Sequence, residues 1–227
     1  MTDQDRDADA IHAARAEIEA IAGPAFDHFP GYTVLDEAHR GGQGVVYRAR
    51  DLATDRTVAI KVMLEGPLAS PEERARFERE MRVLAQLNHP NIVTIHHTSA
   101  PGQDPYFVMD YIDGLPLDRH AAVHGGALRD TLAMFAKVCE AVNAAHVRGV
   151  IHRDLKPGNI RVDRSGEPFV LDFGLAKLDA GRTDASLHTV TGQFVGSLPW
   201  AAPEQLGGDG SRVDTRTDVY ALGVVLY

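Results

Sequence analysis

Cysteine is nearly absent from this sequence of 227 residues, which contains only Cys139. A single cysteine cannot form an intrachain disulfide, so the chain fits a reducing compartment. The apolar residues around Cys139 recur at helical spacing, which favours a buried core thiol. His120 and His124 have the spacing of two metal ligands on one helical turn, but no cysteine or carboxylate cluster joins them. We therefore do not expect a histidine-based metal site.

Long apolar runs and an excess of basic residues are also lacking. No stretch reaches the ~18 consecutive apolar residues of a membrane-spanning helix, and residues 1–9 are acidic where a signal peptide is basic. We expect a cytoplasmic protein, or one at the cytoplasmic face of a membrane if a longer parent carries a downstream membrane segment. The formal net charge of −9 argues against nucleic-acid binding, because phosphate contacts need clustered Lys and Arg.

The order of the apolar patterns predicts a small sheet followed by helices. The acidic segment at residues 1–29 predicts one amphipathic helix, which would serve as a leader or as a docking helix. Its apolar residues recur at spacings of three and four: Ile11, Ala14, Ile18 and Ile21. Short apolar runs predict strands at 32–35, 45–49, 57–62, 92–95 and 106–111. A helix start at Ser70-Pro71-Glu72 separates the third strand from the fourth.

Beyond residue 112 the pattern is mainly helical. A long helix is predicted through Leu132 and Ala145, with short strands after it at 160–162 and 169–171. The segment from Asp218 to Tyr227 is apolar nearly all round, as in a helix buried on every side. We predict an α+β fold in three parts: the leader at 1–29, a small lobe at 30–111 and a partial larger lobe at 112–227.

A glycine-dense turn follows the first predicted strand. Gly41, Gly42 and Gly44 would let backbone N–H groups approach phosphates, although His39 stands where the usual pattern begins with glycine. Alone, the turn fits an ordinary hairpin equally well.

Lys61 lies within the apolar strand Val58-Ala59-Ile60-Lys61, where an unpaired ammonium would be costly to desolvate. Two anionic partners stay open, Glu80 on the following helix and an ATP phosphate. The ordinary alternative is a lysine at a solvent-exposed strand edge.

The strongest feature is the run Ile151-His152-Arg153-Asp154-Leu155-Lys156-Pro157-Gly158-Asn159, followed by Asp172-Phe173-Gly174 and later by Ala202-Pro203-Glu204. Together with Lys61, these motifs resemble the signature set of the eukaryotic-type protein kinases and follow the same order along the chain. Their residues resemble those of the bacterial Hanks-type serine/threonine branch. The resemblance implies a two-lobed protein kinase-like fold. It also implies transfer of the ATP γ-phosphate to serine or threonine hydroxyls of proteins, with Mg²⁺.

Carried over by position, the resemblance assigns the catalytic roles. Asp154 becomes the base or orienter of the substrate hydroxyl, and Lys156 meets the γ-phosphate. Asn159 and Asp172 become the Mg²⁺ ligands, while Asp218 braces the catalytic loop.

The resemblance assigns the nucleotide site in the same way. Lys61, held by Glu80, clamps the α- and β-phosphates of ATP. The implied nucleotide-binding set is His39, Gly41, Gly42, Gly44, Val46, Ala59, Lys61, Asp110, Ile112 and Arg161. Arg161 departs from the family, which usually has an apolar residue under the adenine, but an arginine stem can still cover a base.

Thr189 and Thr191 are the candidate autophosphorylation sites, because a phosphate there could pair with Arg153. A dimer would serve that reaction. The alternative function is a nucleotide-binding or docking module without turnover. Small-molecule phosphotransferases of related fold generally lack the segment that carries Thr189 and the Ala-Pro-Glu anchor.

The resemblance covers only part of a typical kinase domain, so we expect the last helix to lack packing partners. Leu222, Val224, Val225 and Leu226 would then be exposed, at ~1.5–3 kcal/mol for each apolar side chain left in water. Glu204 would lack its partner as well.

Overall fold

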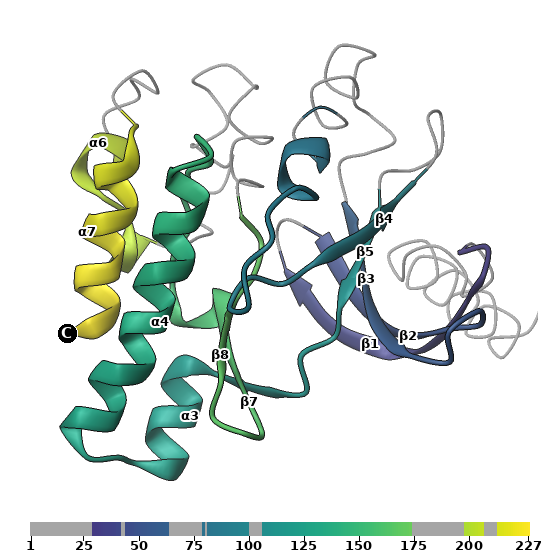
Figure 1. The fold of residues 1–227 in the computed structure, drawn as a ribbon, viewed down its shortest axis with the longest axis horizontal. Coiled ribbons are helices and arrows are strands. Elements are labelled where there is room, and N and C mark those ends of the chain that lie inside the picture. The colour runs from purple at the N-terminus through teal and green to yellow at the C-terminus, as the bar shows by residue number, and fades with distance from the viewer. Residues whose placement is uncertain are drawn as a thin grey trace, which may run out of the picture.

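The computed structural model describes residues 29–41, 44–63, 79, 81–99, 106–173, 198–206 and 213–227. The predicted leader helix, the helix start at Ser70 and the candidate residues Gly42, Glu80, Thr189 and Thr191 lie outside these ranges. Figure 1 shows a twisted sheet on one side of the described part and a helical region on the other.

Five antiparallel strands form the sheet, in the order β1-β2-β3-β5-β4. Their bounds are β1 Tyr32–Gly41, β2 Gly44–Asp51, β3 Thr57–Met63, β4 Ile95–Thr98 and β5 Tyr106–Asp110. Strands β1, β2 and β3 confirm the three N-terminal strands predicted from the sequence, and each is longer than predicted. Every residue of β3 from Val58 to Met63 is buried, because both faces of this central strand are covered.

The predicted strand at 92–95 is wrong in its position. Ile92 makes only an isolated bridge to Val170, and the Val93 N–H donates to the carbonyl of Val170. These apolar residues are buried beside β8 (Pro168–Val170), and the strand proper begins at Ile95. The apolar run at 92–95 therefore reflects the burial of a connecting segment and not a strand with a regular hydrogen-bond ladder.

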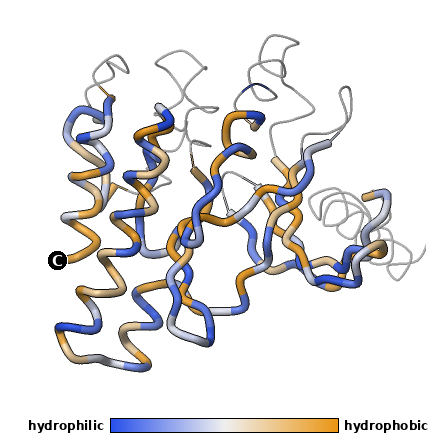
Figure 2. Tube along the Cα trace, in the orientation of Figure 1, coloured by the Kyte–Doolittle hydropathy of each residue, from blue (hydrophilic) through white to orange (hydrophobic). Residues whose placement is uncertain are grey.

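The helical region begins after the chain leaves β5. It contains β6 Gly114–Pro116, α3 Leu117–His124, α4 Leu128–His146, η2 Pro157–Asn159, β7 Ile160–Asp163, β8 Pro168–Val170, η3 Leu198–Trp200, α6 Pro203–Leu206 and α7 Thr215–Leu226. Strands β6, β7 and β8 form a small second sheet. Figure 2 shows the turn between β7 and β8 in hydrophilic colours, whereas the central strands of the large sheet are mostly hydrophobic. Helix α3 was not predicted, because its pattern is only weakly amphipathic.

One continuous core joins the sheet to the helices. It includes Ala59 and Phe107 on the inner face of the sheet. It also includes Val138 of α4, Leu222 of α7, and Leu155 in the loop that follows α4. Cys139 is half-buried against this core, and burial raises the pKa of its thiol. The division at residues 111 and 112 stays a prediction.

Helix α7 corrects two expectations. Its buried side is a stripe of Thr217, Asp218, Ala221 and Leu222, whereas Val219 on the opposite side is 61% exposed, so the helix is not buried all round. Leu222 has packing partners, and Val225 also packs on the core, because α4 lies beside α7 (Figure 1). Leu226 is exposed, as expected.

Within the described helices, none is both long and apolar enough to cross a bilayer.

Candidate active site

The loop between α4 and β7 gathers three polar side chains around one carboxylate. Lys156 Nζ lies 2.8 Å from Asp154 Oδ2, and Asn159 Nδ2 donates to the same oxygen at 3.1 Å. Asn159 Nδ2 also donates to the backbone carbonyl of Asp154 at 2.7 Å. With its amide nitrogen directed at Asp154, Asn159 turns its own carbonyl oxygen away from that carboxylate.

Lys61 and Asp172 form a buried ion pair beside this loop. The Lys61 side chain is 5% exposed, and its Nζ lies 2.8 Å from Asp172 Oδ2. Asp172 supplies the anionic partner that the buried position of Lys61 requires, although the sequence assigns Asp172 only to the metal. Glu80, the protein partner named from sequence, lies outside the described residues.

The second oxygen of Asp172 indicates what the site can bind. Asp172 Oδ1 is buried and has no hydrogen-bond partner in the described ranges. An unsatisfied buried carboxylate oxygen is costly, unless a cation completes it. A hard oxygen ligand suits Mg²⁺, which usually takes one or two protein ligands and fills its remaining positions with phosphates and water.

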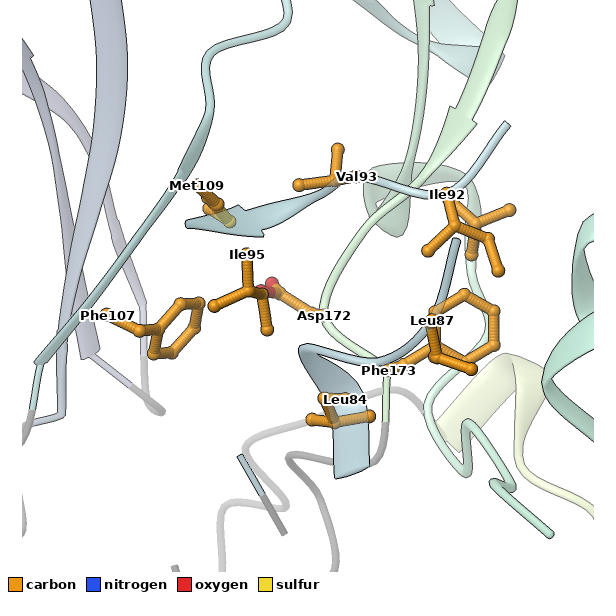
Figure 3. A pocket seen from close by; sticks show the side chains of 10 residues that line it. Leu84, Leu87, Ile92, Val93, Ile95, Phe107, Met109, Asp172 and Phe173 are labelled. Carbon is orange, nitrogen blue, oxygen red and sulfur yellow. The ribbon is translucent and has the colours of Figure 1, made fainter. Parts of the chain in front are cut away.

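An apolar hollow lies behind this carboxylate (Figure 3). Its lining is apolar except for Asp172: Leu84, Leu87, Ile92, Val93, Ile95, Phe107, Met109, Val170 and Phe173. Among low-dielectric neighbours, the attraction between Lys61 and Asp172 is stronger than it would be in water. The surroundings therefore hold the pair together.

Asp218 braces the catalytic loop from α7. Its Oδ1 accepts the Arg153 N–H at 2.9 Å, and its Oδ2 accepts the His152 N–H at 2.8 Å and His146 Nε2 at 2.7 Å. Asp218 is fully buried, so all these donors satisfy a charge that water cannot reach. The brace agrees with the role that the resemblance implies, and His146 adds a contact that the sequence did not predict.

His152 links the catalytic loop to the segment that carries Asp172. Its ring is fully buried, and Nε2 donates to the carbonyl of Leu171 at 2.8 Å. Because that carbonyl can only accept, the proton is on Nε2, and Nδ1 accepts the N–H of Asp154 at 3.3 Å. The ring also lies 4.8 Å from that of Phe173. One side chain therefore contacts the chain beside both Asp154 and Asp172.

Gln205 of α6 holds the same loop through a hydrogen bond to its backbone. Its Nε2 donates to the carbonyl of Arg153 at 2.7 Å, and its Oε1 accepts the N–H of Ala202 at 3.0 Å. Arg153 has a φ of 70°, which is unfavourable for a residue with a side chain. Backbone contacts to Asp218 and Gln205 hold it there.

Glu204 has a partner, contrary to expectation. Its Oε1 accepts the hydroxyl of Thr217 at 2.6 Å, which joins α6 to α7. Thr217 and Gln205 were both missed from sequence, although each directly adjoins a motif residue. A polar residue beside a motif is a weak signal, because most such residues face water.

The predicted nucleotide residues lie on the strands and the connection around this site. Val46 and Lys61 are opposite each other on β2 and β3, and Ala59 pairs with Met109. The Asp110 carboxylate accepts His96 Nε2 at 2.7 Å. Ile112 follows β5 and packs on the continuous core.

Three other predicted nucleotide residues have structural contacts of their own. Arg161 Nη1 donates to the carbonyl of Gly114 at 2.8 Å, which fixes its guanidinium at the second sheet. His39 pairs with Val46, and Gly41 with Gly44, at the end of the β1–β2 hairpin. A Cβ at Gly44 would lie 2.2 Å from the Val62 carbonyl oxygen, so close strand packing alone requires this glycine.

Comparison with known proteins agrees with this geometry. A family model described as a protein kinase domain matches residues 32–227. Serine/threonine-protein kinase PknB of Mycobacterium leprae is 39% identical over 202 residues, which cover 86% of this chain and 32% of the relative. Pkn1 of Myxococcus xanthus, also a serine/threonine-protein kinase by name, is 42% identical over 195 residues, covering 83% and 27%.

The chain thus spans about a third or less of these curated relatives. The crystal structure of the Mycobacterium tuberculosis PknI kinase domain matches with a TM-score of 0.65 and 30% identity, over 90% of this chain and 75% of that one. Sequence motifs, side-chain geometry and fold agree, and the chain belongs to the protein kinase domain family, with bacterial Hanks-type serine/threonine kinases as its relatives.

Proposed function

We propose that this chain is the catalytic part of a serine/threonine protein kinase, which transfers the γ-phosphate of ATP to protein hydroxyls. The observation that carries the proposal is the carboxylate of Asp154, held by Lys156 and Asn159, beside the buried Lys61–Asp172 pair. The printed names of PknB and Pkn1 support serine and threonine as acceptors.

Asp154 is the residue that orients the substrate hydroxyl and accepts its proton. Both side-chain contacts recorded for its carboxylate in the described residues fall on Oδ2, which leaves Oδ1 for the hydroxyl. Lys156 holds the carboxylate in place through its ammonium, and the same ammonium would contact the γ-phosphate when ATP is bound. Positioning of this kind supplies much of the rate in phosphoryl transfer.

Lys61 would bind the α- and β-phosphates of ATP, and Asp172 and Asn159 would hold Mg²⁺. The ion, when bound, offsets negative charge on the phosphates. Within the described residues, no group of three or more His, Cys, Asp or Glu side chains could hold a metal ion. Mg²⁺ usually takes only one or two protein carboxylates and completes its coordination with phosphates and water. Val46, Ala59, Ile112 and the Arg161 stem enclose the adenine.

Thr189 and Thr191 remain our candidates for autophosphorylation. Within the described residues, the recorded hydrogen bonds of Arg153 use its backbone, so they leave its guanidinium for a phosphate. A dimer would allow one copy to modify another. A cytoplasmic location, where ATP is available, belongs to the same proposal.

The variant Asp154→Asn tests the proposal directly. An amide cannot accept the hydroxyl proton, so γ-phosphate transfer to a generic protein substrate should fall by roughly 10²–10⁴, while ATP binding survives. Asp113→Asn is the matched control, because Asp113 forms an exposed ion pair with Arg164. Radiolabel transfer and calorimetric ATP binding measure the two effects. Unchanged transfer in Asp154→Asn would contradict the role of Asp154, and ATP binding without transfer in the unaltered chain would favour the non-catalytic module.

A further inference from the structure

The residue pairing of the large sheet places one histidine of β1 in line with Lys61. His39 of β1 pairs with Val46 of β2, and Val46 pairs with Lys61 of β3. Side chains of residues that pair across antiparallel strands lie on the same face of the sheet. Val46 packs against the continuous core, so His39 and Lys61 share the inner face, with β1 and β3 two strand spacings, or ~10 Å, apart.

A bulge in β1 sets this orientation of His39. The register with β2 shifts between two pairs, Glu37 with Tyr47 and His39 with Val46. Tyr47 belongs to a separate apolar cluster on the outer face of the sheet. Residues two positions apart in a regular strand point to the same face, but the extra residue in β1 directs Glu37 outward and His39 inward.

The ring of His39 lies against the first glycine of the glycine-dense turn. A Cβ added at Gly41 would lie 3.3 Å from His39 Nε2, so the absence of a side chain at Gly41 gives the ring its room. His39 is exposed, and within the described ranges no hydrogen bond to its ring nitrogens is recorded. A ring N–H of His39 can therefore be donated to a ligand at the inner side of the turn.

The charged side chains of β1 leave this place open to an anion. Arg40 Nε and Nη2 donate to the two carboxylate oxygens of Glu37 at 2.9 and 2.6 Å. Arg48 Nε of β2 donates to Asp36 Oδ2 at 3.0 Å. Both carboxylates of β1 are thus paired with arginines, which reduces the repulsion that a phosphate beside His39 would meet.

We propose that the His39 side chain is a phosphate-binding group, which donates a ring N–H to the same chain of nucleotide phosphates that Lys61 binds. The inference rests on the proposed function, which requires ATP at the inner face of the sheet. The family pattern has glycine at this position and assigns no side chain there, so the contact follows from the row of His39, Val46 and Lys61. An imidazole carries at least one N–H donor in either charge state.

The affinities for two ligands test the contact. ATP with Mg²⁺ carries the phosphates, whereas adenosine has the same base and ribose without them. His39→Ala should weaken ATP binding about 3- to 10-fold, as expected for one hydrogen bond, and change adenosine binding less than about 2-fold. His39→Gln keeps an N–H donor and should retain most of the affinity for ATP. Isothermal titration calorimetry measures all these affinities.

His97→Ala is the matched control, because His97 is exposed on β4 at the opposite edge of the sheet. It should bind both ligands as the unaltered chain does. Unchanged or tighter ATP binding by His39→Ala would overturn the inference, and tighter binding would show that the ring obstructs the site. Equal weakening of ATP and adenosine, or a loss in His39→Gln as large as that in His39→Ala, would also overturn it.

The proposed function and the role of His39 fail in different ways. No ATP binding by the unaltered chain would contradict both of them. ATP binding that His39→Ala leaves unaffected would remove the role of His39 alone.

Discussion

At the scale of single residues, Asp172 combines two demands that usually conflict. It pairs with Lys61 through one oxygen, and its other oxygen is buried without a hydrogen-bond partner among the described residues. It does so at a φ of 57°, a left-handed conformation that aspartate tolerates better than most residues. Burial of an unsatisfied oxygen is costly, so the arrangement makes physical sense as a site prepared for a cation.

Asp172→Asn should therefore weaken Mg²⁺-dependent nucleotide binding by at least ~10-fold and change metal-free binding only a few-fold. An amide still fills the space but lacks the charge that a hard cation requires. Titration of a fluorescent ATP analogue with and without Mg²⁺ measures the difference. Asp130→Asn, at an exposed position on α4, is the control. Equal Mg²⁺ dependence in the unaltered chain and in Asp172→Asn would exclude Asp172 as a ligand.

The sequence predicted the motif residues of the site but not the contacts between them. Asp154, Asn159 and Asp172 follow from short motifs, because their spacing within a loop is fixed by the chain. The Lys61–Asp172 pair joins residues more than a hundred positions apart, and His146 looked like one more polar residue on a helix. Such partners depend on how helices and strands pack, which local patterns do not encode.

At the scale of elements, α7 orders the catalytic loop through one side chain near its N-terminus. Asp218 accepts two loop N–H groups and His146, so α4, α7 and the loop meet at one buried carboxylate. The exposed apolar residues of α7 lie on its other side. The apolar sequence pattern predicts that this helix is buried on every side. Hydrophobicity depends only on residue type, however, and does not show which elements pack against the helix.

Asp218→Asn should lower stability by ~1–3 kcal/mol and reduce kcat more than KM for ATP. The amide NH₂ cannot accept a hydrogen bond, so at least one buried loop donor loses its partner. Asp214→Asn on the same helix is a close control, because Asp214 caps α7 by accepting the Arg216 N–H and asparagine caps helices equally well. Denaturant unfolding and steady-state kinetics give both quantities. Identical behaviour of the two variants would refute the brace.

At the scale of the whole molecule, the continuous core connects the sheet to the helices, so we expect the two parts to unfold together. The core reaches from Ala59 and Phe107 in the sheet, through Val138 of α4, to Leu222 of α7. The small-lobe strands could be predicted because their apolar alternation is local, whereas the packing of α7 on α4 could not. Figure 1 shows α4 and α7 side by side, with the C-terminus at the end of α7.

Leu222→Ala tests this continuity. Leu222 is 9% exposed, and truncation of a buried leucine costs ~2–5 kcal/mol, so the melting temperature of the whole domain should fall in a single transition. Leu226→Ala makes the same change on the same helix at a side chain that is 47% exposed, and should cost under ~0.5 kcal/mol. Circular dichroism gives the melting curves, and exchange of the β3 and β5 amides shows whether the sheet is destabilised together with α7. If Leu222→Ala destabilised α7 and left β3 and β5 unchanged, the two halves would unfold independently, and the continuous apolar contact between them would contribute little to cooperativity.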